Sequence, residues 1–225
     1  MMVVRRPPPP SVEPIEPEYV DLGLPSGNLW ATCNLGAETE TDYGLYFQWG
    51  DTKGYKGACV ESESDGNDDM HYFDWSKYKF NTQEGLTKYN NIDNKTVLDV
   101  EDDAVVVVLG GDWRMPTSEE FLELIDNTDP GDGANQYGWV TNYNGTGING
   151  ILRKSKTNGN TIFFSACGGC RENSSYSVGN GGNYWSNCLS TNDSAQPLAF
   201  YSGDFRLGNN SRIYGFPIRA VKPTE

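Results

Sequence analysis

The residues from Thr161 to Val221 read TIFFSACGGCRENSSYSVGNGGNYWSNCLSTNDSAQPLAFYSGDFRLGNNSRIYGFPIRAV. Short apolar segments alternate there with polar loops; the segments are Thr161–Ala166, Tyr184–Trp185, Pro197–Tyr201 and Phe216–Val221. Short apolar runs separated by clusters of Asn, Ser, Asp and Gly are typical of strands joined by turns. We therefore expect this part of the chain to form antiparallel strands, and the rest of the sequence is interpreted around it.

The loops between these strands are rich in Asn, Ser, Gly and Tyr. Small hydrogen-bonding side chains interleaved with tyrosines are also typical of antibody binding loops. Loops held on a rigid β scaffold are a common place for a binding surface. Turn formation alone explains the glycines, but it explains less well why Tyr176, Tyr184, Tyr201 and Tyr214 lie beside them.

Composition limits the class of protein. The chain has 225 residues, 36% of them apolar and 12% aromatic, with 26 Gly and 12 Pro. That balance favours short strands and turns over long helices. A net charge of −14 disfavours binding to nucleic acid. No run approaches the roughly 20 apolar residues of a membrane span, so we expect no membrane insertion.

Residues 1–18 are expected to form a linker or anchor, and residues 19–225 a single domain. Pro7–Pro10 favours extended polyproline II, although an unstructured tail fits the composition equally well. No apolar run follows Arg5 and Arg6, so we expect no secretory signal in this segment. Five cysteines cannot all pair within one chain, which favours reduced thiols and assembly in a cytoplasm.

Propensity and alternation predict further strands. They are Tyr19–Leu22, Leu29–Cys33, Tyr43–Trp49, Ala104–Leu109, Tyr137–Asn142, Gly150–Ser155 and Thr161–Ser165. Between residues 51 and 94 the chain is acidic, aromatic and irregular, so we expect an insertion there. Thr117 and Glu120 match a capping box, which predicts a short helix ending near Asn127.

Cys167 and Cys170 form a C-x-x-C motif, which suits a redox pair or half a zinc site. The two glycines between them and the lack of a second ligand pair favour a structural loop instead. An EF-hand beginning at Asp65 fails, because its sixth and twelfth positions are Met70 and Ser76. A looser structural calcium site at Asp65–Asp69 or Asp129–Asp132 stays open, with a solvated acidic loop as the favoured alternative.

No catalytic set is evident in the sequence. The chain has one histidine, His71, and it has no nucleophile elbow or phosphate-binding glycine loop. We therefore expect a non-enzymatic binding module without a required cofactor.

Several segments resemble one known family. They are YVDLGLPSGNLWATCN (Tyr19–Asn34), YFQWG (Tyr46–Gly50), DWRMPT (Asp112–Thr117), GNYWS (Gly182–Ser186) and YGFPIR (Tyr214–Arg219). In order and over residues 19–221, they are similar to the Fibrobacter succinogenes major paralogous domain family of Bacteroidetes and their phages. The resemblance implies a C-type-lectin-like fold of the formylglycine-generating-enzyme type. This is an α+β fold with short twisted antiparallel sheets, one or two short helices and long loops.

The resemblance also bears on details. The family usually has a short helix where Ala104–Leu109 lies, whereas propensity predicts a strand, so the resemblance leaves this element open. The family includes variable proteins of diversity-generating retroelements, whose C-terminal segment is mutagenised at adenines. Residues 166–221 would be that variable binding region. The Gln196–Leu198 and Thr191–Asp193 segments match no sugar-binding C-type lectin motif, which argues against the calcium-dependent mode of those lectins.

Together these points predict a receptor-binding domain of a phage virion. The protein would be part of a fibre or attached to the capsid, and it would be made in the host cytoplasm. Its partners would be a host cell-surface protein or glycan and, through the N-terminus, a larger virion assembly; a homo-oligomer stays open. The predicted ligand contacts are Asn173, Ser175, Tyr176, Asn187, Tyr201, Asp204, Arg206, Asn209, Asn210 and Tyr214. Trp30, Trp49, Trp113 and Trp185 are expected in the core, with Arg114 and Arg219 pinning loops.

The sequence leaves two alternatives open. One is a bacterial cell-surface adhesin or lipoprotein module, which would use the same loops on a cell surface. The other is a thiol or metal oxidoreductase acting through Cys167 and Cys170.

Overall fold

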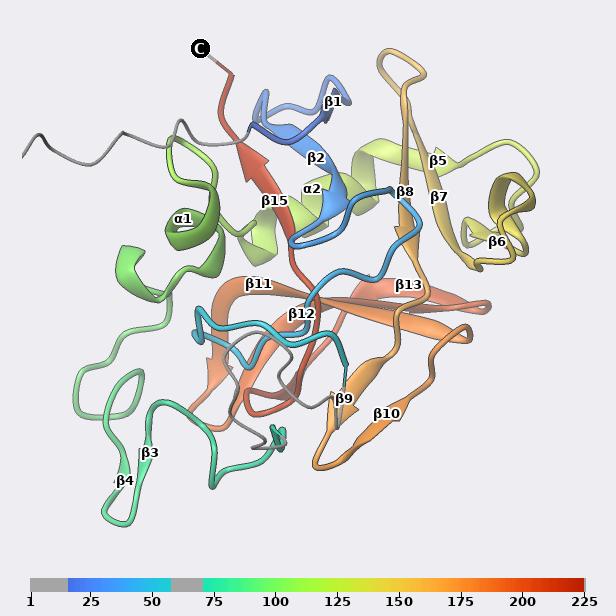
Figure 1. Ribbon diagram of the computed structural model, residues 1–225. Coiled ribbons are helices and arrows are strands. Elements are labelled where there is room, and N and C mark those ends of the chain that lie inside the picture. Colours follow the sequence, from blue (N-terminus) through green and yellow to red (C-terminus); the bar gives the residue numbers. More distant parts are fainter. Residues whose placement is uncertain (1–15, 58–70, 225) are drawn as a thin grey trace, which may run out of the picture.

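The computed structural model describes residues 16–57 and 71–224. Most of the predicted linker and the Asp65–Asp69 segment lie outside the described residues. The described chain forms small antiparallel sheets and two short α-helices joined by long loops (Figure 1). The α+β class and the antiparallel sheets predicted from the sequence are confirmed.

The first sheet joins the two ends of the described chain. Its three antiparallel strands are β1 (Tyr19–Asp21), β2 (Leu29–Asn34) and β15 (Arg219–Lys222), in the order β1-β2-β15. Because the last strand pairs with β2, the beginning and end of the domain lie side by side (Figure 1). The sheet packs Trp30 against Phe121 of helix α2 (Ser118–Asn127).

The second sheet is formed around β7 (Gly150–Ser155). Its other strands are β5 (Thr128–Pro130) and β6 (Trp139–Val140), which both pair with β7, and β8 (Thr161–Ser165), which pairs with the opposite edge of β7. The predicted strands Gly150–Ser155 and Thr161–Ser165 are confirmed. The prediction for Tyr137–Asn142 was too long, because Gly138 has φ 92° and Asn142 φ 52°, and these turn conformations end the pairing on both sides.

The third sheet contains the longest strands. Its members are β11 (Gly181–Thr191), β12 (Ser194–Tyr201), β13 (Asp204–Leu207) and β14 (Asn210–Ser211). β12 is central, with β11 on one edge and β13 and β14 on the other. The separate hairpin of β9 (Gly169–Arg171) and β10 (Ser174–Tyr176) precedes it (Figure 1).

Helix α2 confirms the helix expected from the capping box. Thr117 accepts a hydrogen bond from the backbone of Glu120 at 3.1 Å, and the Glu120 carboxylate accepts one from the backbone of Thr117 at 2.8 Å. Glu120 also pairs with Arg114, at 2.5 Å between Oε1 and Nη2. The half-buried Arg114 therefore fixes the entrance to the helix, as expected.

The strand predicted from propensity at Ala104–Leu109 is wrong: these residues form helix α1. Asp103 caps the helix, because its carboxylate accepts the backbone N–H of Val105 at 2.9 Å and of Val106 at 3.2 Å. The same side chain accepts the Met115 N–H at 2.9 Å. A local cap and a tertiary contact thus outweigh the β propensity of valine.

Two further expectations need correction. Tyr43–Trp49 is not a continuous strand; it makes single bridges from Tyr46 to Tyr55 and from Phe47 to Phe216, with Gly44 and Gly50 at positive φ on either side.

The region of residues 51–94 is not wholly irregular. Its described part contains the hairpin β3 (Asn81–Thr82) and β4 (Gly85–Leu86), and the 3₁₀ turns η1 (Val100–Asp102) and η2 (Tyr143–Gly145) lie further along the chain.

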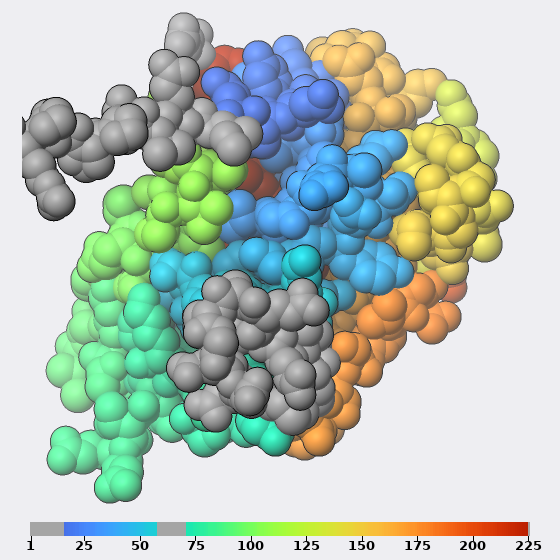
Figure 2. All heavy atoms as spheres, in the orientation of Figure 1, coloured from blue at the N-terminus to red at the C-terminus, as the bar shows by residue number. Residues whose placement is uncertain are grey.

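The core contains the predicted tryptophans, since Trp30, Trp49, Trp113 and Trp185 are all buried. Two of them exchange hydrogen bonds between distant segments: Trp49 Nε1 donates to the Ser186 carbonyl and Trp185 Nε1 to the Phe47 carbonyl, both at 2.9 Å. The blue-to-cyan N-terminal segment runs across the middle of the face in Figure 2. These reciprocal bonds attach it to β11.

No helix among the described residues is long and apolar enough to span a membrane.

Candidate binding site

The candidate site lies on one face of the third sheet and follows from strand alternation. Asn183 pairs with Ala199, Gly181 with Tyr201, Tyr201 with Asp204 and Ala199 with Arg206. Residues paired across antiparallel strands lie on the same face, and every second residue shares that face. On the other face, Tyr184, Leu198 and Phe200 are buried in the core. The polar residues point outward because they alternate along the strands with these buried residues.

These outward residues line a groove with a volume of about 450 Å³. Its remaining walls come from the segment before β11 and from the loop after β13; they are Ser177, Asn180, Gly208, Asn209 and Asn210. Small residues keep its floor low. A Cβ atom at Gly208 would lie 3.0 Å from Cβ of Ala199, so a larger residue there would crowd the floor. Gly182 faces the opposite side of the sheet, where a Cβ atom would lie 2.4 Å from Cζ of the buried Phe200.

Tyr201 forms one wall of the groove and is the most exposed aromatic residue in it. Of its surface, 52% is accessible to solvent. The ring packs over the next turn, since a Cβ atom at Gly203 would lie 3.2 Å from Cε2 of Tyr201. The turn supports the ring from one side, and much of the rest is available to a ligand.

Asp204 and Arg206 supply the charges of the groove. Arg206 Nε donates to Asp204 Oδ2 at 2.5 Å. The two residues lie on alternate positions of β13, so both side chains project from the same face. The pair leaves the groove with no net charge from these two groups.

The sequence-predicted contacts Tyr201, Asp204, Arg206, Asn209 and Asn210 therefore all line one groove. Asn173 and Ser175 lie apart from it, exposed on the β9–β10 hairpin. Tyr176 and Tyr214 are half-buried and pack on each other, with ring centroids 6.2 Å apart; Tyr214 packs in turn on Phe216. Burial raises the pKa of Tyr176. These two tyrosines hold the hairpin against the core more than they offer a free surface.

Asn187 does not lie on the surface, and its prediction as a ligand contact is wrong. Only 8% of the residue is exposed. Its N–H donates to the Pro116 carbonyl at 2.8 Å, and its own carbonyl accepts the Leu98 N–H at 3.0 Å. The middle of β11 around Asn187 is thus covered by neighbouring segments.

A scan against protein-family models found no match, and searches of curated proteins and of solved structures found none either. The site's chemistry is therefore argued from its own geometry.

Sequence reasoning missed several residues of the groove. Asn183 and Ala199 face it from β11 and β12, and Ser177, Asn180 and Gly208 complete its walls. A signal for Asn183 and Ala199 was present, because apolar Tyr184, Leu198 and Phe200 alternate with them. Gly208 lines the groove because its N–H donates a hydrogen bond to the Pro197 carbonyl at 2.7 Å, which holds the loop after β13 against β12. No local sequence pattern predicts this contact.

The cysteine pair has the properties of buried structural residues. Cys167 and Cys170 are both buried, with no exposed surface. Burial raises the pKa of Cys167 to about 12. A redox or metal-binding thiol needs the opposite shift, because the thiolate is its reactive form.

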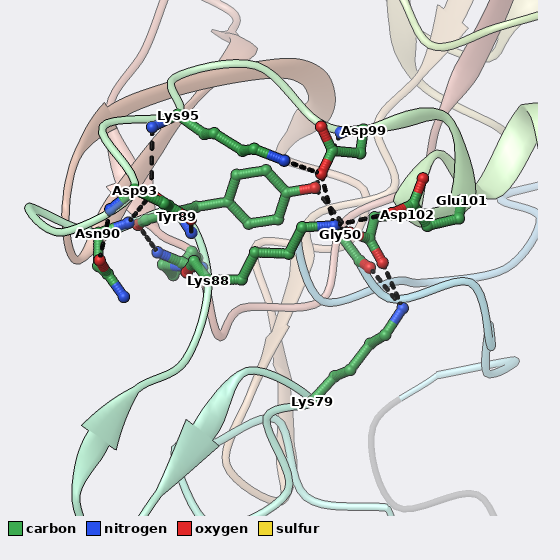
Figure 3. Close-up of polar contacts among 11 residues, drawn as sticks. Gly50, Lys79, Lys88, Tyr89, Asn90, Asp93, Lys95, Asp99, Glu101 and Asp102 are labelled. Carbon is green, nitrogen blue, oxygen red and sulfur yellow. Dashed lines mark hydrogen bonds and ion pairs between the residues drawn. The ribbon is translucent and has the colours of Figure 1, made fainter.

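A cluster of carboxylates was a candidate for a cation site. The carboxylate oxygens of Asp99, Glu101 and Asp102 lie within 4.8 Å of one another. Lys88 Nζ already contacts all three, and Lys79 Nζ lies 2.7 Å from Asp102 Oδ1 (Figure 3). The ammonium groups take the place that a metal ion would have. Lysine side chains therefore already neutralise these carboxylates.

A second groove, of about 490 Å³, lies between Asn90–Thr96 and the far end of the β11–β12 hairpin. The fully buried Arg212 holds its two walls together, since Nη1 donates to the Tyr89 carbonyl at 2.8 Å and to the Asn192 carbonyl at 2.9 Å. Lys95 on its rim is paired with Asp99 at 2.5 Å. It offers no exposed aromatic side chain, so the first groove is the better candidate binding site.

Proposed function

We propose that this chain is a non-enzymatic recognition domain that binds a host cell-surface ligand in the groove of the β11–β12–β13 sheet. The observation that carries the proposal is the convergence of Tyr201, Asp204, Arg206, Asn209 and Asn210 on one groove. They come from separate strands and loops. A sheet that presents polar side chains and one exposed aromatic ring suits ligand recognition.

The sequence resemblance supports the wider assignment. The motifs similar to the major paralogous domain family suggest a C-type-lectin-like fold, and the small antiparallel sheets, short helices and long loops agree with that choice. The same resemblance favours a phage virion protein, attached through the proline-rich N-terminus to a larger assembly. In a bacterial adhesin the groove would serve the same purpose on a cell surface.

The test is binding of the fluorescently labelled full chain to a panel of intact Bacteroidetes cells. The variant Ala199→Trp fills the groove from its floor while the strand retains its backbone pairing. Its control is Thr161→Trp, a change to the same residue at an exposed position of strand β8 that lines neither groove. We expect binding by the wild type and the control, and loss of binding by Ala199→Trp with an unchanged melting temperature.

Binding that Ala199→Trp leaves intact would place the site elsewhere on the molecule. Failure of the wild type to bind any cell would overturn the recognition function.

A further inference from the structure

We propose that the groove binds a neutral carbohydrate and does so without calcium. This inference rests on the proposed recognition function and identifies the class of ligand. It commits to a glycan, whereas the function alone admits a protein receptor as well.

The shape of the groove favours a small ligand unit. Its volume of about 450 Å³ is within the range of small-molecule sites, roughly 300–1,000 Å³. A protein receptor instead needs about 800 Å² of surface on each partner with an apolar centre. Around this groove the centre is a concave floor of Gly181, Ala199 and Gly208, and the walls are polar.

The groove offers the alternating donors and acceptors that sugar hydroxyl groups require. Asn210 Nδ2 donates to Asn183 Oδ1 at 3.3 Å, which leaves the amino group of Asn183 and the carbonyl oxygen of Asn210 for a ligand. The Asn209 side chain is exposed and makes no hydrogen bond to the residues that the structure describes. Each sugar hydroxyl both donates and accepts, so it can satisfy such mixed groups.

Tyr201 provides the apolar contact. A sugar ring has a face of polarised C–H groups, and the electron-rich face of an aromatic ring attracts them. The ring is already held against Gly203, so its ordering costs little on binding. Tyr201 and Asp204 are direct cross-strand partners, which places a stacking surface beside a carboxylate acceptor.

The charges select a neutral ligand. Asp204 and Arg206 neutralise each other at 2.5 Å, and they are the charged residues among those that line the groove. An acidic sugar would need an unpaired cation. Calcium needs 6–8 oxygen ligands, and a single carboxylate already paired with arginine is a poor start for such a site. The carboxylate cluster of Asp99, Glu101 and Asp102 is filled by lysine and does not line the groove.

The experiment has two parts. In the first, the full chain is applied to an array of neutral and acidic bacterial oligosaccharides, with and without EDTA. We expect binding to neutral glycans that is insensitive to EDTA, lost in Ala199→Trp, weakened roughly tenfold or more in Tyr201→Ala, and retained in Thr161→Trp. Melting temperatures of all variants are measured, so that a variant that fails to fold is recognised.

In the second part, cells that bind the chain are treated with periodate or with proteinase K before binding. Loss after periodate and retention after protease is the expected result. Loss only after protease identifies a protein receptor and overturns the glycan assignment, while the recognition function stands. Preference for acidic glycans, or loss of binding in EDTA, also overturns it. Absence of binding to both cells and glycans refutes the function and the inference together.

Discussion

Arg219 and Asn34 lie 185 positions apart in the sequence, yet Nε and Nη2 of Arg219 both donate to Oδ1 of Asn34, at 2.9 and 2.8 Å. Arg219 is fully buried, and burial lowers its pKa. Among the described residues no carboxylate is hydrogen-bonded to it; its other acceptors are the carbonyls of Ala31 and Phe163, at 3.3 and 3.0 Å. A neutral amide therefore provides the main acceptor for a buried cation.

Asn34→Ala should destabilise the fold by about 3 kcal/mol, because it leaves the buried guanidinium short of acceptors. Urea unfolding followed by tryptophan fluorescence measures the change. Asn209→Ala is the matched control: it removes an exposed amide that has no partner among the described residues, and its effect should stay within about 0.5 kcal/mol. Equal effects of the two substitutions would contradict the role given to Asn34.

Asp102 should make stability depend on pH. Burial acts to raise its pKa, but hydrogen bonds from Lys79, Lys88 and Tyr89 outweigh burial and hold the pKa below its usual value. A carboxylate whose pKa is lower in the folded state stabilises the fold above its unfolded pKa of about 3.9, and this stabilisation is lost as the pH falls through the folded pKa.

Asp102→Asn should therefore cost about 2 kcal/mol at pH 7, and its difference from the wild type should shrink as the pH falls below about 4. Unfolding curves from pH 7 to pH 3 measure both. The control Asp132→Asn changes a carboxylate that is 90% exposed, and its curve should follow the wild type. If the difference in unfolding free energy between Asp102→Asn and the wild type stayed constant with pH, the charge of Asp102 would not be the source of its stabilising effect.

Arg212 should control the local stability of the second groove. Its guanidinium joins Tyr78, Tyr89 and Asn192, and a lysine has one nitrogen in place of three. Arg212→Lys should cost about 3 kcal/mol and speed hydrogen exchange at the amides of Leu98 and Leu189, which join the two walls. Exchange measured by mass spectrometry checks this. Unchanged hydrogen exchange at Leu98 and Leu189, with faster exchange elsewhere, would disprove the role of Arg212 in joining the two walls.

Thiol labelling should separate the cysteines by burial. Cys33 is half-buried, whereas Cys167, Cys170 and Cys188 are buried. Of these four cysteines in the described part of the chain, iodoacetamide should modify Cys33 first in native protein and the three buried ones only after denaturation, as read by peptide mass spectrometry. Rapid native labelling of Cys167 would revive the oxidoreductase alternative.

The sequence was most informative where the deciding contacts are local. The capping box at Thr117 and Glu120 predicted helix α2 because both partners lie within one turn. Alternation likewise located β7 and β8. The helix α1 was misjudged from propensity because its cap, Asp103, is fixed in part by Met115, a contact that no local rule includes.

The candidate site shows the same limit. Tyr201, Asp204 and Arg206 were found because loop composition reflects exposure. Asn187 has the same residue type but lies where β11 is covered by Pro116 and Leu98, and composition does not report such coverage. Asn183 of the same strand lines the groove, and only the three-dimensional packing distinguishes the two positions.

The separation of the two faces of the third sheet has a consequence for how this protein can change. Asn183, Ala199 and Arg206 contribute to strand pairing through the backbone, while the inward Tyr184, Leu198 and Phe200 carry the packing. Replacing the outward set therefore alters the shape and chemistry of the groove at little thermodynamic cost. A combinatorial library at those positions should be composed largely of folded proteins, so that selection can act on new specificities from a single scaffold.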